Sequence, residues 1–167
     1  MTPTTEAANL PADARIRTEV QVMFFDTDAA AVVHNIAYLR FIETNRTLLA
    51  GYLGMSLAEM ARSQQYPVVV RTEIDYKRPA TLGDTLVVEG WLERLERIRF
   101  WCGFTIKRQG DDDTVLVRCR QMLALVQMPA GKPIRLSEEW LARYGHLIKA
   151  QPSEEAATSR KYGGQVL

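Results

Sequence analysis

The chain has 167 residues, an apolar fraction of 47% and a formal net charge of +1, which is sufficient for one domain with a hydrophobic core. Its Lys and Arg residues are scattered among acids and leave no excess of positive charge, so a nucleic-acid partner is not expected. No apolar run is long enough to cross a bilayer, and the first ten residues lack the pattern of a signal peptide. We therefore expect a cytoplasmic protein without a membrane span.

The two ends of the chain differ in composition from its middle. Residues 1–15 and 150–167 are rich in Thr, Ala, Pro and acids without periodicity, which predicts a flexible tail at each end. Residues 16–149 contain no repeat or long linker, so we expect a single domain there. Cys102 and Cys119 are too far apart for a Cys-x-x-Cys pair and lie in strand-like segments, and we interpret both as structural thiols.

The first third of the middle region predicts a strand followed by two helices. Residues 17–25 alternate as a strand does, and the pattern stops at an Asp-Thr-Asp turn signal. An apolar stripe with helical spacing then predicts a helix of about four turns. Its members are Tyr38, Phe41, Ile42, Leu48, Leu49, Tyr52 and Leu53. Asn45 interrupts this stripe, and residues 55–64 predict a short helix with Ser56 and Glu59 in a capping box.

The remainder of the middle region reads as β-structure with one closing helix. Strand-like segments lie at residues 68–76, 85–95, 99–109 and 114–128, with a hairpin turn at residues 110–113. Residues 91–100 fit a helix about as well as a strand. Residues 137–145 begin with a capping serine and predict a last short helix. This order predicts an α+β fold in which an antiparallel sheet is wrapped around one long central helix.

Asp26 and Asp28 lie where the first strand ends and the long helix is about to begin. One interpretation is that one aspartate caps the helix and the other is a solvated turn residue. Another is a metal-binding Asp-x-Asp, but no third carboxylate or histidine stands at ligand spacing, so we expect no metal.

Two motifs resemble the signatures of the hotdog-fold acyl-CoA thioesterases, in the 4-hydroxybenzoyl-CoA thioesterase-like branch. The first is "FFDTDAAAVVHNIAYLRFIETNR", residues 24–46, and the second is "IDYKRPATLGDTLVV", residues 74–88. The resemblance extends over about residues 17–127. It implies a hotdog fold, hydrolysis of an acyl-CoA thioester to a free acid and coenzyme A, and pairing of the sheet with a second copy of the chain.

The resemblance also implies roles for residues near the start of the long helix. Asp28 would attack the thioester carbonyl or activate a water molecule, and a backbone N–H in the range Ala31, Val32 and Val33 would stabilise the oxyanion. Asn35 would be an auxiliary polar group. Most relatives have glycine where this chain has Ala31, so a turn that requires positive φ would be strained here.

Further residues are candidates for binding the substrate. Phe24 is expected in the wall of the acyl pocket, and His34 and Tyr38 match positions near the substrate, although His34 as an uninvolved histidine and Tyr38 as a core residue remain open. Four basic residues border segments that line the coenzyme A groove in similar proteins; they would bind its phosphates, or they are solvated strand-end residues. They are Lys77, Arg78, Arg97 and Arg99. No cofactor is expected, because coenzyme A is part of the substrate, and the assembly would be a homodimer or homotetramer.

Three alternatives stay open at this point. The substrate could be carried by an acyl-carrier protein instead of coenzyme A. The chain could bind acyl groups without hydrolysing them, for which Ala31 is the sequence hint. A dehydratase with the hotdog fold would depend on a histidine such as His34. The acyl group itself cannot be assigned from these motifs.

Overall fold

The computed structural model describes residues 13–147. The predicted tails at residues 1–15 and 150–167 therefore lie almost entirely outside the described residues. Within residues 13–147, no helix is both long enough and apolar enough to cross a membrane.

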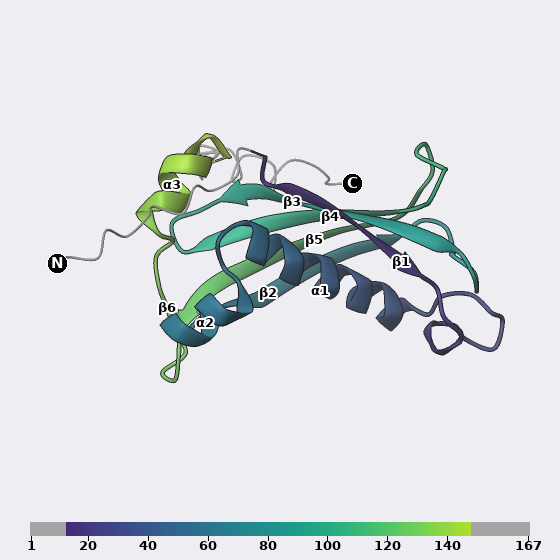
Figure 1. Ribbon diagram of the computed structural model, residues 1–167, viewed down its shortest axis with the longest axis horizontal. Coiled ribbons are helices and arrows are strands. Elements are labelled where there is room, and N and C mark those ends of the chain that lie inside the picture. The colour runs from purple at the N-terminus through teal and green to yellow at the C-terminus, as the bar shows by residue number, and fades with distance from the viewer. Residues whose placement is uncertain (1–12, 148–167) are drawn as a thin grey trace, which may run out of the picture.

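A single antiparallel sheet forms one layer of the structure (Figure 1). Its strand order is β1-β3-β4-β5-β2, with the short β6 paired to the end of β5. The strands are β1 (Arg15–Gln21), β2 (Gln65–Tyr76), β3 (Thr85–Leu95), β4 (Arg99–Arg108), β5 (Val115–Gln127) and β6 (Lys132–Pro133). β1 and β2 are thus the two edge strands of the main path, each with one unpaired side.

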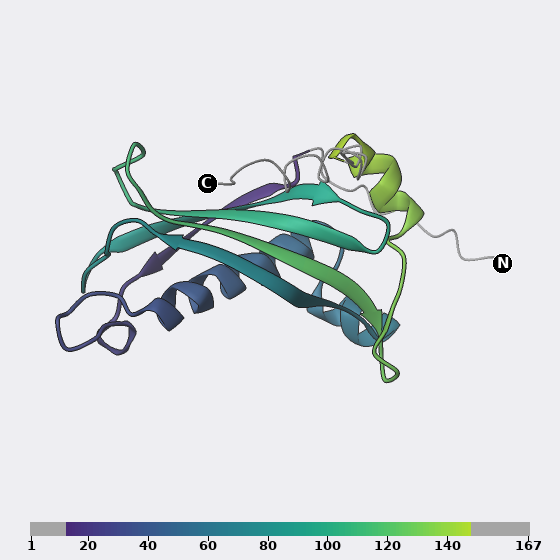
Figure 2. The same ribbon diagram turned by 180° about the vertical axis from the view of Figure 1, so that it is seen from behind.

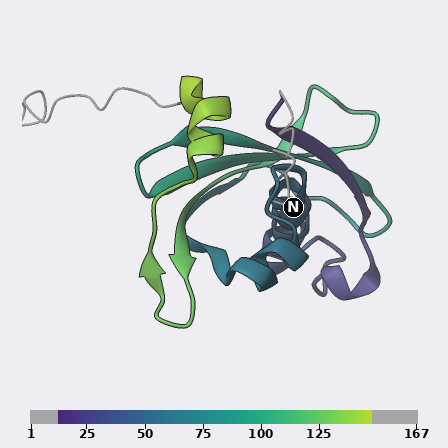
Figure 3. The same cartoon turned by 60° about the vertical axis from the view of Figure 1, so that its left-hand side comes forward.

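Three helices accompany the sheet: α1 (Asn35–Tyr52), α2 (Leu57–Ser63) and α3 (Glu138–Tyr144). Short 3₁₀ turns lie at Phe24–Asp26 and Gly145–Leu147. α1 runs along one face of the sheet, and the opposite view shows the sheet in front of it (Figure 2). The end view shows the sheet curving over α1 (Figure 3). The curled antiparallel sheet expected for a hotdog fold is therefore confirmed. A single long helix is not, because residues 13–147 contain three helices and α3 lies outside the curve of the sheet that encloses α1 (Figure 3).

The core lies between α1 and the facing side of the sheet. The fully buried side chains include Ile42 and Leu49 of α1, Leu86 and Val88 of β3, and Phe104 of β4. Leu48 and Tyr52, which the apolar stripe included, are 53% and 45% exposed. The buried face of α1 is thus narrower than the sequence predicted.

Asn45 is completely buried in this stripe; its amide nitrogen is hydrogen-bonded there, whereas its Oδ1 has no hydrogen-bond partner within residues 13–147. Its Nδ2 donates to Thr18 Oγ1 at 2.9 Å and to the Val88 carbonyl at 3.0 Å. A Cβ atom at Gly90 would collide with Asn45 Oδ1. Asn45 therefore ties the middle of α1 to β1 and β3 at the place where the absence of a side chain at Gly90 leaves room.

Several predicted boundaries differ from the structure. The strand predicted over residues 17–25 is wrong at both ends, because β1 spans Arg15–Gln21 and Phe24–Asp26 form a 3₁₀ turn. The Asp26 carboxylate accepts the Met23 N–H at 2.9 Å, which closes this turn before the strand can continue. α1 begins at Asn35, earlier than the apolar stripe, because His34 Nδ1 caps it by accepting the Ala37 N–H at 3.1 Å.

The remaining elements follow the sequence more closely. Residues 91–100 are strand at both ends, since β3 ends at Leu95 and β4 begins at Arg99. The hairpin at residues 110–113 is confirmed, as are the serine caps of the two short helices, Ser56 and Ser137. The Glu59 side chain does not complete a capping box and pairs with Arg62 instead.

Candidate active site

Asp28 lies in a small exposed hairpin that connects the 3₁₀ turn to α1. Thr27 and Val33 form an antiparallel bridge, and the Asp28 N–H donates to the Val32 carbonyl at 2.9 Å. Asp28 Oδ1 accepts the Ala30 N–H at 2.8 Å and is 3.4 Å from the Val32 nitrogen. Within residues 13–147, Asp28 Oδ2 has no hydrogen-bond partner. One oxygen thus orders the turn, and the other is available to a substrate or to water.

Ala31 has a φ of 58°, in the left-handed region. The tight turn between Asp28 and Val32 therefore requires the conformation for which glycine is best suited, and alanine adopts it at a cost of about 1–2 kcal/mol. The hairpin that carries Asp28 forms despite this strain.

Asp26 has different surroundings although it stands only two residues away. Its side chain is 1% exposed and forms an ion pair with Arg40 of α1. Its backbone carbonyl accepts the His34 N–H at 3.0 Å. Neither aspartate caps α1, because His34 does so. Among the described residues, no group of three or more His, Cys, Asp or Glu side chains is arranged to hold a metal ion.

The two motifs that are far apart in the sequence meet at this hairpin. The Val33 N–H donates to the Ala80 carbonyl at 2.9 Å, and the Leu82 N–H donates to the Ala31 carbonyl at 3.0 Å. Val32 and Thr81 form a further antiparallel bridge. The second motif therefore holds the Asp28 hairpin through backbone hydrogen bonds.

Asp84 orders the segment that makes these contacts. Its Oδ2 accepts the Thr81 N–H and the Arg108 Nε–H, each at 2.8 Å. Partial burial alone would raise the pKa of Asp84, but these hydrogen bonds and the Arg108 charge outweigh it and lower the pKa. The segment between Ala80 and Asp84 is thus stabilised by an ionised carboxylate.

The N–H groups proposed from sequence as oxyanion donors are mostly engaged within the protein. The Ala31 N–H donates to the Asp28 carbonyl, the Val33 N–H to the Ala80 carbonyl, and the Val32 N–H faces Asp28 Oδ1. The first two N–H groups of α1, those of Asn35 and Ile36, have no acceptor within residues 13–147. A helix N-terminus leaves such groups free and gives them partial positive charge.

A cavity of about 290 Å³ lies beside this helix start. It is lined by Val33, Asn35, Tyr38, Tyr76, Lys77, Arg78 and Pro79. The Tyr38 hydroxyl accepts the Ala80 N–H at 2.7 Å, and burial raises its pKa, so it is a neutral phenol. The Tyr76 hydroxyl donates to the Asn35 carbonyl at 3.3 Å. The structure therefore brings together Asn35, Tyr38, Lys77 and Arg78 from two distant segments.

Other candidates from the sequence are placed elsewhere. Arg97 and Arg99 lie at the turn between β3 and β4, about 35 Å along β3 from the end that adjoins the Asp28 hairpin. Phe24 is 80% exposed on the 3₁₀ turn and does not line the cavity. His34 is half-buried and uses Nδ1 as the cap of α1.

Sequence reasoning missed two features of this region. It did not find the ion pair between Asp26 and Arg40; Glu43 lies 3.7 Å from Arg46, one of the two arginines that its helical spacing allowed as a partner. It also gave no role to Tyr76, although this residue stands in the second motif. Helical spacing identifies neighbours on one helix but carries no information about a turn that folds back on it.

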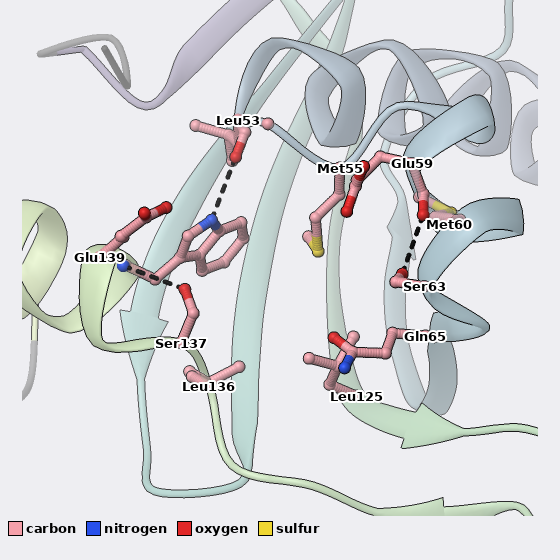
Figure 4. A pocket seen from close by; sticks show the side chains of 12 residues that line it. Leu53, Met55, Glu59, Met60, Ser63, Gln65, Leu125, Leu136, Ser137 and Glu139 are labelled. Carbon is pink, nitrogen blue, oxygen red and sulfur yellow. Dashed lines mark hydrogen bonds between the residues drawn. The ribbon is translucent and has the colours of Figure 1, made fainter. Parts of the chain in front are cut away.

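A second cavity, of about 180 Å³, lies at the other end of α1 (Figure 4). Its apolar walls include Leu53, Met60, Leu125, Leu136 and Trp140. The Trp140 Nε1–H donates to the Leu53 carbonyl at 3.0 Å. No sequence motif indicated this cavity, because its walls come from four separate segments of ordinary core residues.

Comparisons with known proteins agree with the two motifs. Residues 22–144 match the family model of the Thioesterase-like superfamily. The chain is 26% identical over 129 residues to the Bacillus subtilis (strain 168) protein named "Putative acyl-CoA thioesterase YneP", covering 75% of this chain and 92% of that protein. It is 29% identical over 134 residues to a 1,4-dihydroxy-2-naphthoyl-CoA hydrolase of Thermosynechococcus vestitus, covering 80% of this chain and 88% of that protein. A structure titled "Probable Thioesterase from Bartonella henselae" matches with a TM-score of 0.67 and 28% identity, covering 74% of this chain and 99% of that one.

Proposed function

The chain belongs to the thioesterase-like superfamily, and on this premise we propose that it hydrolyses an acyl-CoA thioester to a free carboxylic acid and coenzyme A. In this proposal α1 is the central helix of a hotdog fold. The observation that supports it best is the meeting of the two thioesterase-like motifs at one place. Among the described residues, Asp28 Oδ2 and the first two N–H groups of α1 have no hydrogen-bond partner, and Val33 of the same hairpin lines the cavity that carries the basic residues.

Asp28 supplies the reacting carboxylate. Either Oδ2 attacks the thioester carbon and forms an acyl-enzyme anhydride that water then hydrolyses, or Oδ2 removes a proton from the water molecule that attacks. In both routes the C–S bond breaks and the thiolate of coenzyme A leaves and takes up a proton. The two N–H donors of the Asp28 turn hold Oδ1, so that Oδ2 has a defined direction.

The start of α1 stabilises the negative charge on the thioester oxygen. We assign this role to the N–H groups of Asn35 and Ile36 rather than to the engaged N–H groups of Ala31 and Val33. Loss of one such donor typically costs about 3 kcal/mol of transition-state stabilisation. The charge of the helix dipole acts in the same direction.

The cavity next to α1 accepts the pantetheine arm of coenzyme A, and Lys77 and Arg78 at its mouth bind the phosphates. Coenzyme A is then part of the substrate, and no separate cofactor takes part in this scheme. Arg97 and Arg99 could contact the same coenzyme A only from a second copy of the chain, because they lie at the opposite end of the sheet.

A second copy would pair with the edge strand β2. Val68, Val69 and Val70 in the middle of this strand are 40%, 41% and 50% exposed, and a strand edge with apolar side chains is suited to pairing with another strand. A two-fold symmetric pair of β2 strands is antiparallel, so the Gln65 end of one copy faces the Tyr76 end of the other. Sedimentation equilibrium distinguishes this homodimer from a homotetramer.

Two other functions fit the same residues. An acyl-carrier-protein thioesterase would use Asp28 in the same way, and the same acyl group supplied on both carriers separates it from an acyl-CoA thioesterase. A non-hydrolytic binding protein was suggested by Ala31, but Ala31 adopts the left-handed conformation that the turn requires. This observation favours an intact catalytic turn.

The test is thiol release from a panel of aliphatic and aromatic acyl-CoA substrates by wild type and Asp28→Asn. We expect turnover of at least one substrate, with a loss of about a hundredfold or more in Asp28→Asn. Glu138→Gln is the matched control, because it removes an exposed carboxylate at the start of α3. Equal turnover by wild type and Asp28→Asn would exclude Asp28 as the reacting group. Absence of turnover on both carriers would favour a binding protein.

A further inference from the structure

Asp26 connects three parts of the structure around the proposed active site. Its carboxylate accepts the Met23 N–H at 2.9 Å, which closes the turn after β1, and pairs with Arg40 in the second turn of α1. Its backbone carbonyl accepts the His34 N–H at 3.0 Å, and His34 is the cap of α1. One residue thus joins the end of β1, the start of α1 and the second turn of that helix.

Arg40 is held in place by aromatic rings as well as by charge. Its guanidinium carbon lies 5.2 Å from the ring centroid of Phe25 and 5.4 Å from that of Phe41. Phe41 is a core residue of α1, whereas Phe25 is 67% exposed on the 3₁₀ turn. Arg40 therefore fastens the 3₁₀ turn to α1 through its contacts with Asp26 and Phe25.

These contacts determine where Asp28 stands relative to the free N–H groups of α1. Asp28 follows Asp26 by two residues, and Asn35 follows His34 directly. The His34–Asp26 hydrogen bond is therefore one of the short links between the proposed reacting carboxylate and the proposed oxyanion donors. A displacement of about 1 Å between such groups can lower a rate by about a hundredfold.

We propose that Arg40 and Asp26 act as a pair of positioning residues that set the distance between the Asp28 carboxylate and the N-terminus of α1. This inference rests on the proposed thioesterase function. Asp26 itself is 1% exposed and fully engaged, so it takes no direct part in the reaction. Without Arg40, a buried carboxylate would lose its counter-charge, and the turn would open to hydrate it.

The variants Arg40→Gln, Arg40→Lys, Asp26→Asn and the double variant Asp26→Asn/Arg40→Gln test this pair. Arg40→Gln is expected to lower kcat by about 10- to 100-fold while KM stays within about threefold, because Arg40 does not line the cavity proposed for coenzyme A. Arg40→Lys keeps the charge and is expected to recover kcat to within about fivefold of wild type. The double variant is expected to be no slower than the slower single variant, because the two residues act as a unit.

Amide hydrogen exchange provides a readout that does not need turnover. Arg40→Gln is expected to increase the exchange rate of the His34 N–H at least about tenfold, while the Val88 N–H in β3 keeps its rate. Arg62→Gln is the matched control, because Arg62 also pairs with a carboxylate, Glu59, but on α2. It should change neither kcat nor His34 exchange.

Three results would overturn the inference. They are unchanged His34 exchange in Arg40→Gln, additive losses of kcat in the double variant, and a kcat of folded Arg40→Gln within twofold of wild type. If Asp28→Asn abolishes turnover and Arg40→Gln does not affect it, only the positioning role fails. If wild type releases no thiol, the proposed function fails, and the exchange rates alone decide whether Arg40 holds the start of α1.

Discussion

The two ends of α1 each adjoin a cavity, and the two cavities are lined by different kinds of residue. The one at the N-terminal end is lined by a helix start, two tyrosines and two basic residues. The one at the C-terminal end is lined by Leu, Met and Trp side chains together with polar ones, among them Glu59, Ser63 and Gln65 (Figure 4). They are separated by the length of an 18-residue helix, about 27 Å. In the proposed function the reaction takes place at the N-terminal end, because Val33 of the Asp28 hairpin lines the cavity there.

The forces that hold the two ends also differ. At the N-terminal end, backbone hydrogen bonds and the carboxylates of Asp26 and Asp84 order the loops. At the C-terminal end, the Trp140 ring packs edge-on against Phe100 at 5.5 Å and Tyr144 at 5.8 Å between centroids. At the C-terminal end, the free energy of unfolding should therefore depend mainly on side-chain packing. At the N-terminal end, it should depend on charge and backbone geometry.

The largest expected effect on stability comes from Trp140→Ala at the C-terminal end. Trp140 is 6% exposed, and removal of a buried Trp typically lowers the free energy of unfolding by about 3–5 kcal/mol. Urea unfolding measures this loss. The fraction that remains folded should keep the kcat of wild type, because no group of the proposed reaction lies at this end.

Trp140→Phe is the matched variant, because it keeps an aromatic ring and removes the Nε1–H that donates to the Leu53 carbonyl. It should cost less than Trp140→Ala, and the lost hydrogen bond accounts for about 1 kcal/mol of that cost. A fall of kcat in folded Trp140→Phe would show that packing at the C-terminal end of α1 affects the reaction at its N-terminal end.

Acid should weaken the N-terminal end through Asp84. Because the folded pKa of Asp84 is lowered, its stabilising contribution is fully present above its unfolded pKa, about 3.9, and is lost as pH falls through the folded pKa. Asp84→Asn should therefore lower the free energy of unfolding by about 1–2 kcal/mol at pH 7. The difference from wild type should shrink at pH values below about 3.9.

Urea unfolding at several pH values between 7 and 3 checks this dependence. Glu138→Gln is again the control, because its carboxylate is exposed at the start of α3. A difference between Asp84→Asn and wild type that stays constant down to pH 3 would mean that ionisation of Asp84 is not what orders the segment from Ala80 to Asp84.

The sequence predicted which residues gather at the N-terminal end of α1 better than it predicted their contacts. The residues that meet there are Asn35, Tyr38, Lys77 and Arg78. The motifs contain all four, because each is close along the chain to the turn segments that the motifs describe. The Arg40–Asp26 pair depends on how a 3₁₀ turn folds back onto α1, and the separation of Arg97 from the site depends on strand direction. The C-terminal cavity had no signal, because Leu53 and Trp140 look like any core residues until their elements are packed.

The smallest expected effect on the free energy of unfolding comes from backbone strain, which occurs at one residue near each end of α1. Ala31 at the N-terminal end and Gln64 after α2 are the two non-glycine residues with positive φ within residues 13–147, at 58° and 56°. Glycine relieves this strain, and part of the gain is offset by its greater freedom in the unfolded chain. Ala31→Gly should therefore raise the free energy of unfolding by about 1 kcal/mol in urea unfolding.

Gln64→Gly is the matched variant at the other end, and its gain should be smaller because the Gln64 Nε2–H that donates to the Ala61 carbonyl at 2.7 Å is lost. The two variants should differ in turnover as well. Ala31 lies inside the Asp28 turn, so its relaxation shifts the direction of Oδ2 and should change kcat by a few-fold, whereas Gln64→Gly should leave kcat unchanged. Destabilisation by Ala31→Gly would mean that contacts of the Ala31 methyl group, together with the entropy cost of glycine, outweigh the backbone strain. The positive φ of Ala31 would then not lower the stability of this turn.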